Sequence, residues 1–181
     1  MRTLRSLQVL PTPSGYDRLS RIFHWLTVAL LVAQFVLGWL MPDAHSLKAP
    51  TGRVAWHVGV GTSLLLVIAL RIMWAALRRP APVVELGLLT LVSTAVHMSL
   101  YALLLLVPLL GWLNASGRGW SVRLAGIFNL PQIATADSFG ASLGERHSAS
   151  ATILLILVGL HVFTVVAHQL LSEDDVLGRM L

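Results

Sequence analysis

Four long apolar segments, separated by shorter polar and charged stretches, set the pattern of the chain. They cover about residues 22–41, 54–77, 88–113 and 148–171. An α-helix needs about 20 apolar residues to cross a hydrocarbon core roughly 30 Å thick, and each segment meets that length. The pattern therefore predicts an all-α fold, an integral membrane four-helix bundle that forms a single domain over residues 1–181.

The connections between these segments are polar, and the third connection is the longest. It covers residues 114–146 and contains Trp120, Ile127 and Phe128 among glycine, serine and arginine residues. Aromatic and aliphatic side chains in such a setting favour a short helix that lies in the membrane interface. Inside the third segment, Pro108 predicts a kink, because proline has no N–H to donate to the preceding turn.

Composition supports a membrane protein and excludes several kinds of site. The 181 residues are 56% hydrophobic and 12% charged, about half the charged fraction of a soluble domain. The 13 Lys and Arg lie near the ends of the apolar segments rather than in a basic patch, so we expect no nucleic-acid partner. The chain has no cysteine, which excludes disulfides, iron–sulfur clusters and haem attached through thioether bonds.

The distribution of Lys and Arg predicts the orientation in the membrane. With both termini on one side, eight of these residues lie on that side and five on the other. The eight are Arg2, Arg5, Arg18, Arg21, Arg71, Arg78, Arg79 and Arg179, and the five are Lys48, Arg53, Arg118, Arg123 and Arg146. The excess favours both termini in the cytoplasm. We therefore expect a multi-pass membrane protein, surrounded by lipid, with its first segment as an uncleaved anchor.

Two histidines on the fourth segment carry the strongest chemical signal. His147 and His161 stand fourteen positions apart. On an α-helix, that spacing returns to within about 40° of the same face and rises roughly 21 Å. An imidazole inside a membrane is costly unless it forms a hydrogen bond or binds a metal. Two imidazoles on one face at two depths therefore indicate two binding sites, and two stacked haems would explain them.

Two further histidines lie at matching depths on other segments. His24 lies at the cytoplasmic entry of the first segment, and His161 lies toward the cytoplasmic side of the fourth. His57 lies near the outer end of the second segment, and His147 lies at the outer end of the fourth. Two facing imidazoles at one level are the axial ligands of a low-spin b-type haem, which carries electrons and has no open position for dioxygen. A histidine-lined proton or metal-ion transporter without haem is the alternative from another class, although no inverted repeat or broken helix supports it.

Three more polar residues in the cytoplasmic half are candidates for a second role. Arg71 follows His57 by fourteen residues, so it lies on the same helix face at the inner depth. It could bind a haem propionate or a quinone carbonyl, or extend to the lipid headgroups. His97 and His168 are protonatable groups that quinone reduction would use, or packing residues of the membrane helices.

The chain resembles the bacterial cytochrome b561 family over about residues 16–181. The resemblance rests on YDRLSRIFHWL in the first segment, WHVGVG followed by Arg71 in the second, HMSLY and PLLGW in the third, and GERHSASATILLILVGLHVFTVVAHQL in the fourth. It implies two haems b and a place in the bacterial inner (cytoplasmic) membrane. By matching motif, His24 and His161 would bind the iron of the cytoplasmic-side haem, and His57 and His147 that of the periplasmic-side haem.

The family includes a superoxide oxidase, an enzyme that oxidises superoxide to dioxygen and reduces ubiquinone. That resemblance implies a superoxide:ubiquinone oxidoreductase, with ubiquinone as the electron acceptor. The five outer cations Lys48, Arg53, Arg118, Arg123 and Arg146 would attract the superoxide anion, or would simply contact lipid headgroups. An alternative within electron transfer is a cytochrome b subunit or anchor that serves a partner dehydrogenase or hydrogenase, with a redox partner protein as the donor.

Overall fold

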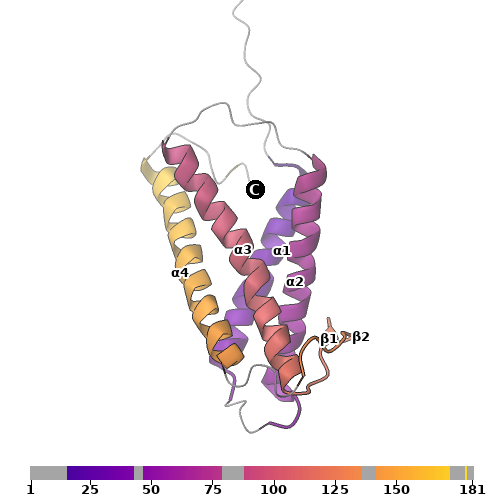
Figure 1. Cartoon of the computed structure of the whole chain (residues 1–181). Coiled ribbons are helices and arrows are strands. Elements are labelled where there is room, and N and C mark those ends of the chain that lie inside the picture. The colour runs from indigo at the N-terminus through magenta and orange to yellow at the C-terminus, as the bar shows by residue number, and fades with distance from the viewer. Residues whose placement is uncertain (1–15, 43–46, 79–87, 136–141, 172–177, 179–181) are drawn as a thin grey trace, which may run out of the picture.

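A computed structural model describes residues 16–42, 47–78, 88–135, 142–171 and 178 of the chain. Its elements in chain order are α1 (Arg18–Trp39), α2 (Gly52–Arg78), α3 (Leu88–Gly117), β1 (Arg123–Leu124), β2 (Phe128–Asn129) and α4 (Ser142–Leu171) (Figure 1). Within these residues, four helices are long and apolar enough to cross a membrane. The predicted all-α membrane bundle of four helices is therefore confirmed.

Each helix extends beyond its predicted apolar segment at one end at least, because polar residues continue its first or last turn, and α1 stops at Trp39, two residues before the predicted boundary. At the start of α1, the Asp17 carboxylate accepts hydrogen bonds from the backbone N–H groups of Leu19 and Ser20, which caps the helix. At the start of α4, six residues precede the predicted boundary, so His147 lies inside the helix rather than at its entry. This position gives His147 the fixed direction of a helical side chain.

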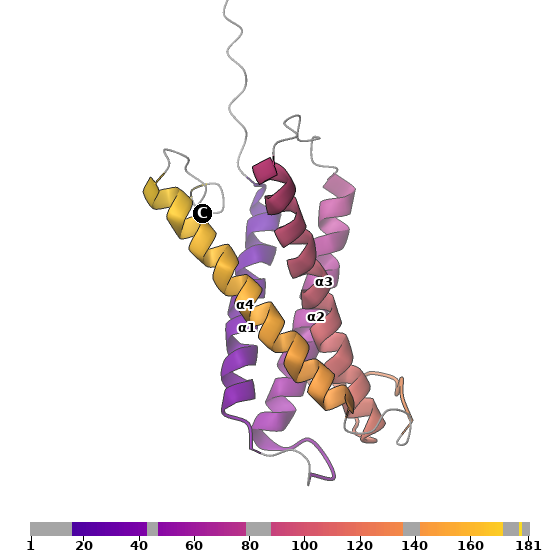
Figure 2. The same ribbon diagram turned by 60° about the vertical axis from the view of Figure 1, so that its left-hand side comes forward.

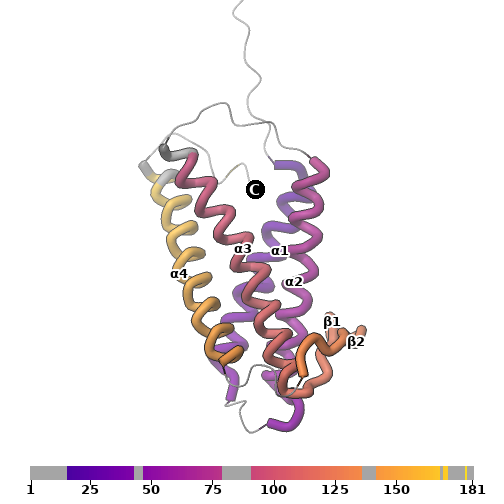
Figure 3. The backbone as a smooth tube through the Cα atoms, viewed as in Figure 1, coloured from indigo at the N-terminus to yellow at the C-terminus, as the bar shows by residue number. Residues whose placement is uncertain are grey.

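The helices pack in sequence around the bundle. Helix α1 packs on α2, α2 on α3, and α3 on α4. In the described part of the chain, α1 and α4 have no Cα atoms within 8 Å of each other, and α4 runs obliquely to the other helices (Figure 2). The first turn of α1 and the last turn of α4 lie at the same end of the bundle (Figure 3). Which side of the membrane that end faces stays a prediction from the cation count.

The prediction of an interfacial helix in the third connection is wrong, because this segment folds as a β-hairpin. Strands β1 and β2 pair antiparallel, with Leu124 opposite Phe128. Ala125 and Gly126 adopt left-handed φ values of 50° and 73°, which suit a tight hairpin turn rather than a helix. The hairpin is anchored by the Thr62 hydroxyl, which donates to the Arg123 carbonyl at 3.0 Å. This hydrogen bond fixes β1 against α2.

The large apolar residues Trp120, Ile127 and Phe128 of that segment are divided between core and surface. Trp120 is 5% exposed and packs with Val54 and Ala115. Ile127 and Phe128 are 72% and 68% exposed at the hairpin. Of these three side chains, only that of Trp120 therefore contributes to the core at this end of the bundle.

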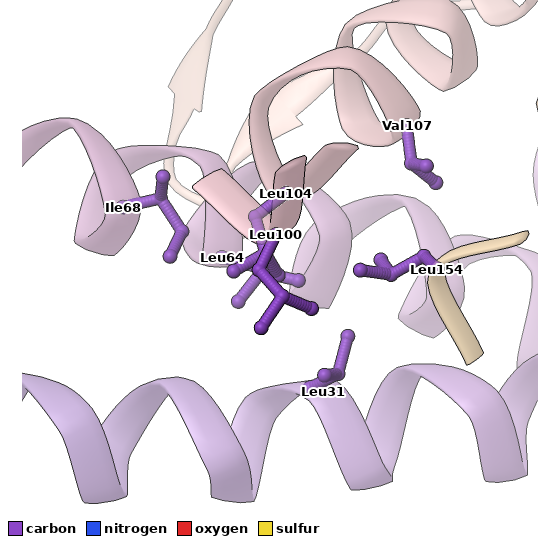
Figure 4. Close-up of a cluster of buried hydrophobic side chains, with 7 residues drawn as sticks. All are labelled: Leu31, Leu64, Ile68, Leu100, Leu104, Val107 and Leu154. Atoms are coloured by element: carbon purple, nitrogen blue, oxygen red, sulfur yellow. The ribbon is translucent and has the colours of Figure 1, made fainter. Parts of the chain in front are cut away.

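The middle of the bundle is a layer of leucines, one from each helix. Leu31, Leu64, Leu104 and Leu154 are 9%, 2%, 6% and 1% exposed and belong to one buried cluster (Figure 4). We call these four residues the leucine layer. Lipid tails are as apolar as leucine, so close packing rather than water exclusion holds such a layer together in a membrane. Because the four leucines pack in one layer, they fix the depth of the neighbouring turns of all four helices.

The cap of α1 gives the first testable prediction. Asp17 also accepts a hydrogen bond from Trp74 Nε1 at 3.2 Å, so it joins the ends of α1 and α2. The Ser20 amide, foremost among its partners, lowers the pKa of Asp17, and the charge of Arg78 acts in the same direction. Asp17 therefore stabilises the fold above its ordinary pKa, and this contribution disappears as the pH falls through the lowered folded-state pKa.

We expect Asp17→Ala to lower the melting temperature of the detergent-solubilised protein at pH 7 and to weaken its dependence on pH in the acid range. Asp17→Asn is the matched control, since asparagine also caps helices but does not titrate. It should keep most of the stability at pH 7 and lose the acid dependence. A melting temperature unchanged by the alanine would contradict the role of this cap.

Candidate functional site

The positions seven residues before and after the leucine layer carry the candidate functional residues. Seven residues are nearly two helical turns, so these positions share the face of each leucine and lie about 10 Å away along the helix. We call the set nearer β1 and β2 the hairpin layer: Gly38, His57, Gly111 and His147. We call the set nearer the chain ends the terminal layer: His24, Arg71, His97 and His161. Each helix supplies one residue to each layer.

The hairpin layer brings two histidine rings together. The ring centroids of His57 and His147 are 6.1 Å apart, and the ring planes are 86° to each other. His147 Nδ1 lies 2.9 Å from the Val107 carbonyl. A carbonyl only accepts, so Nδ1 carries the proton and Nε2 keeps its lone pair. Metal-binding histidines often donate one ring nitrogen to a carbonyl and bind the metal through the other. His147 has this arrangement, with Nδ1 on the carbonyl and Nε2 available.

His57 is held by a residue that the sequence analysis missed. The Gln34 side-chain amide lies 2.9 Å from His57 Nε2. His57 Nδ1 is buried and has no hydrogen-bond partner among the described residues. A buried ring nitrogen without a partner is costly unless a further group satisfies it. Gln34 is the one amide side chain in the first apolar segment, and that isolation was the available signal.

A cavity of about 720 Å³ surrounds this histidine pair. Its wall includes residues from all four helices and the segment before β1, among them Gln34, His57, His147 and Trp120. This volume lies in the range of about 300–1,000 Å³ that is usual for cofactor and ligand sites. The cavity, the two imidazoles and the unpartnered Nδ1 together suit a flat cofactor whose metal takes one ligand on each face.

The terminal layer is built around Arg71. Its Nη2 donates to His24 Nδ1 at 3.2 Å, and its guanidinium lies 5.3 Å from the centre of the Tyr101 ring. The sequence left open whether Arg71 points into the bundle or extends to the headgroups. These contacts place it inside the bundle, between α1 and α3. An arginine in a membrane interior needs such partners, and an anionic or carbonyl ligand would add to them.

The terminal layer also contains a third histidine. The His97 and His161 rings are 5.2 Å apart at 80°, and His97 Nδ1 donates to the Ser93 carbonyl at 2.7 Å. The sequence predicted His24 and His161 at one depth; in the structure His97 lies against His161, and His24 bonds to Arg71. The side chain of His168 lies outside the described residues.

The five outer cations occupy different surroundings. Arg118 is half-buried in the cavity wall, where its guanidinium lies 5.2 Å from the Trp120 ring centre. Arg53 donates to the Leu40 carbonyl at 3.0 Å, and Arg123 to Asn129 Oδ1 at 3.1 Å. Lys48 and Arg146 are exposed. Arg118 is therefore the one of the five that lines the cavity beside the histidine pair.

Comparisons with known proteins identify the family. The profile of the prokaryotic cytochrome b561 family matches residues 15–181. Cytochrome b561 homolog 2 of Escherichia coli (strain K12) is 29% identical over 178 residues, which cover 94% of this chain and 93% of that protein. Cytochrome b562 of Cereibacter sphaeroides is 26% identical over 177 residues, 92% of this chain and 95% of that protein. The chain therefore belongs to the prokaryotic cytochrome b561 family, membrane cytochromes that transfer electrons by means of b-type haem.

Proposed function

We propose that this protein is a two-haem cytochrome b of the bacterial inner membrane, and that it oxidises superoxide to dioxygen at the periplasmic face and reduces ubiquinone. The observation that carries the proposal is the pair of polar layers, about 21 Å apart along the helices, on either side of the leucine layer. Bound haem would supply one-electron redox chemistry. Two superoxide anions give up two electrons, and one ubiquinone takes these with two protons to form ubiquinol.

In this proposal, His57 and His147 hold the hairpin-side haem, and His24 and His161 hold the terminal-side haem. The Val107 carbonyl keeps the proton of His147 on Nδ1 and leaves Nε2 for iron. The hairpin layer faces the periplasm and both termini lie in the cytoplasm, as the cation count indicates. Arg118 attracts the superoxide anion to the cavity.

The terminal layer has the groups that quinone reduction requires. Arg71 offers guanidinium donors to a carbonyl oxygen or a haem propionate, and Tyr101 and His24 hold it in place. His97 uses Nδ1 for the Ser93 carbonyl, which leaves Nε2 free to accept and donate a proton. His168, seven residues beyond His161 on α4, is a second candidate for proton transfer. Ubiquinone would bind near these residues.

Haem content tests the ligand assignment. The purified protein should contain about two haems b per chain, measured by the pyridine haemochrome assay. His57→Ala or His147→Ala should each remove one haem and leave the other, since each removes an axial ligand from the same site. His97→Gln, in the other layer, should retain two. Loss of both haems from either single alanine variant, or a colourless wild-type protein, would contradict the assignment.

Stopped-flow mixing with superoxide tests the electron donor. The oxidised protein should be reduced rapidly, and the rate should fall as ionic strength rises, because salt screens the attraction of the anion. Arg118→Gln should slow the reduction several-fold and reduce its salt dependence. Arg146→Gln, an exposed cation outside the cavity wall, is the matched control. Slow reduction that ignores ionic strength would instead favour a partner dehydrogenase or hydrogenase as donor.

Arg71→Met tests the terminal layer. Removing a positive charge beside His24 should lower the midpoint potential of the terminal-side haem by on the order of 50 mV, because the reduced haem loses a favourable interaction. Quinone reduction should also slow. Arg71→Lys keeps the charge and should restore most of the potential. Arg78→Met, which removes a guanidinium stacked on Trp74 at the helix end, should leave both potentials unchanged. A shift confined to the hairpin-side haem would disprove this placement.

A further inference from the structure

We propose that α3, which carries none of the four proposed haem ligands, positions one of them: Gly111 and the Val107 carbonyl together set the plane of the His147 ring. The inference rests on the proposed haem ligation by His57 and His147. It makes Gly111 a positioning residue, which acts through His147 and does not itself touch the iron.

The first step is the hydrogen bond between α3 and α4. Val107 is 8% exposed, and its carbonyl accepts from His147 Nδ1 at 2.9 Å. In an α-helix this carbonyl points toward the N–H of the residue four positions later, which is Gly111. A carbonyl has two lone pairs and can accept a second donor beside its helical one. To reach it, the His147 ring must lie directly against the backbone at Gly111.

The second step is the space at Gly111. A Cβ atom there would stand 3.1 Å from His147 Cε1 and 3.3 Å from Nδ1. These separations are shorter than ordinary van der Waals contact, so the ring would have to move by a few tenths of an ångström. The two nearest atoms form the ring edge that bonds to Val107. A methyl group would therefore push this edge away from its acceptor.

The third step is the register of the hairpin layer. Gly38 on α1 has the same relation to His57 as Gly111 has to His147, with a Cβ position 3.4 Å from His57 Cε1. Both glycines lie seven residues from a leucine of the buried layer, at the depth of the two rings. Each ring of the pair is thus backed by a glycine from the helix paired with its own, and the contact at Gly111 is the tighter.

The consequence concerns ring orientation. The His57 and His147 planes are 86° apart. The EPR spectrum of a low-spin ferric haem depends on the angle between the planes of its two axial imidazoles, and nearly perpendicular planes give a strongly anisotropic signal. With haem bound, Gly111 and Val107 would set its EPR signature through the plane of the His147 ring, and the hydrogen bond to Val107 would influence the midpoint potential because it raises the basicity of the imidazole.

The test compares Gly111→Ala with Gly59→Ala in the purified full-length protein. Gly59 is also helical, and a Cβ there would meet nothing within 4 Å, so it is the matched control. We expect Gly111→Ala to shift the large-g EPR signal and the midpoint potential of the hairpin-side haem, or to reduce occupancy of that haem, while the terminal-side haem keeps its signal. Gly59→Ala should match the wild type. Alanine is the better helix former, so propensity would not explain a loss.

A double-mutant comparison separates positioning from general packing. If Gly111 acts through His147, adding Gly111→Ala to His147→Ala should change neither the melting temperature nor the remaining haem signal. An unchanged EPR signal in the single variant, or an equal loss of stability in both backgrounds, would overturn the inference. A His147→Ala protein that still contains two haems would instead overturn the ligand assignment, so the two failures are distinguishable.

Discussion

The structure depends on one packing constraint, the common register of the leucine layer. Each helix contributes one buried leucine at the same depth, and the interdigitation of these side chains prevents a helix from sliding by a turn without opening a void. A spacing of seven residues is nearly two turns, as in the packing of other helix bundles. Fixing the leucines therefore fixes the depth of both polar layers, one on each side.

Inside a membrane, the polar groups of these layers have no water to bind, so several of them bond to a neighbouring helix, while His57 Nδ1 has no partner among the described residues. The pairs follow the helix packing. In the terminal layer, Arg71 of α2 meets His24 of α1, and His97 of α3 lies against His161 of α4. In the hairpin layer, His147 of α4 donates to Val107 of α3. The polar contacts thus reinforce the α1–α2 and α3–α4 pairs, and α1 and α4 stay apart in the described residues.

Glycine has a specific use in this arrangement. At the depth of the hairpin layer, two helices carry histidine and two carry glycine, and each glycine lets a ring approach the backbone. Of the two glycines that follow His57 in the sequence, Gly59 faces open space, whereas a Cβ at Gly61 would stand 3.0 Å from the Gln34 side chain that contacts His57. Proximity along the chain alone therefore does not identify the glycines that back the two rings, whereas the seven-residue register identifies Gly38 and Gly111. The β-hairpin also depends on a tertiary contact, because Thr62 of α2 anchors it.

The sequence by itself determined the four membrane helices and the family, because apolar length and the helical period act within one segment. From their matching depths, the sequence predicted that His57 and His147 face each other, and their rings do lie together. Only the tertiary structure decided that Arg71 points inward, that His97 lies against His161, and that Gly111 backs His147. The helical period fixes depth and face along one helix, but the rotation of each helix toward its neighbours is set by packing between them.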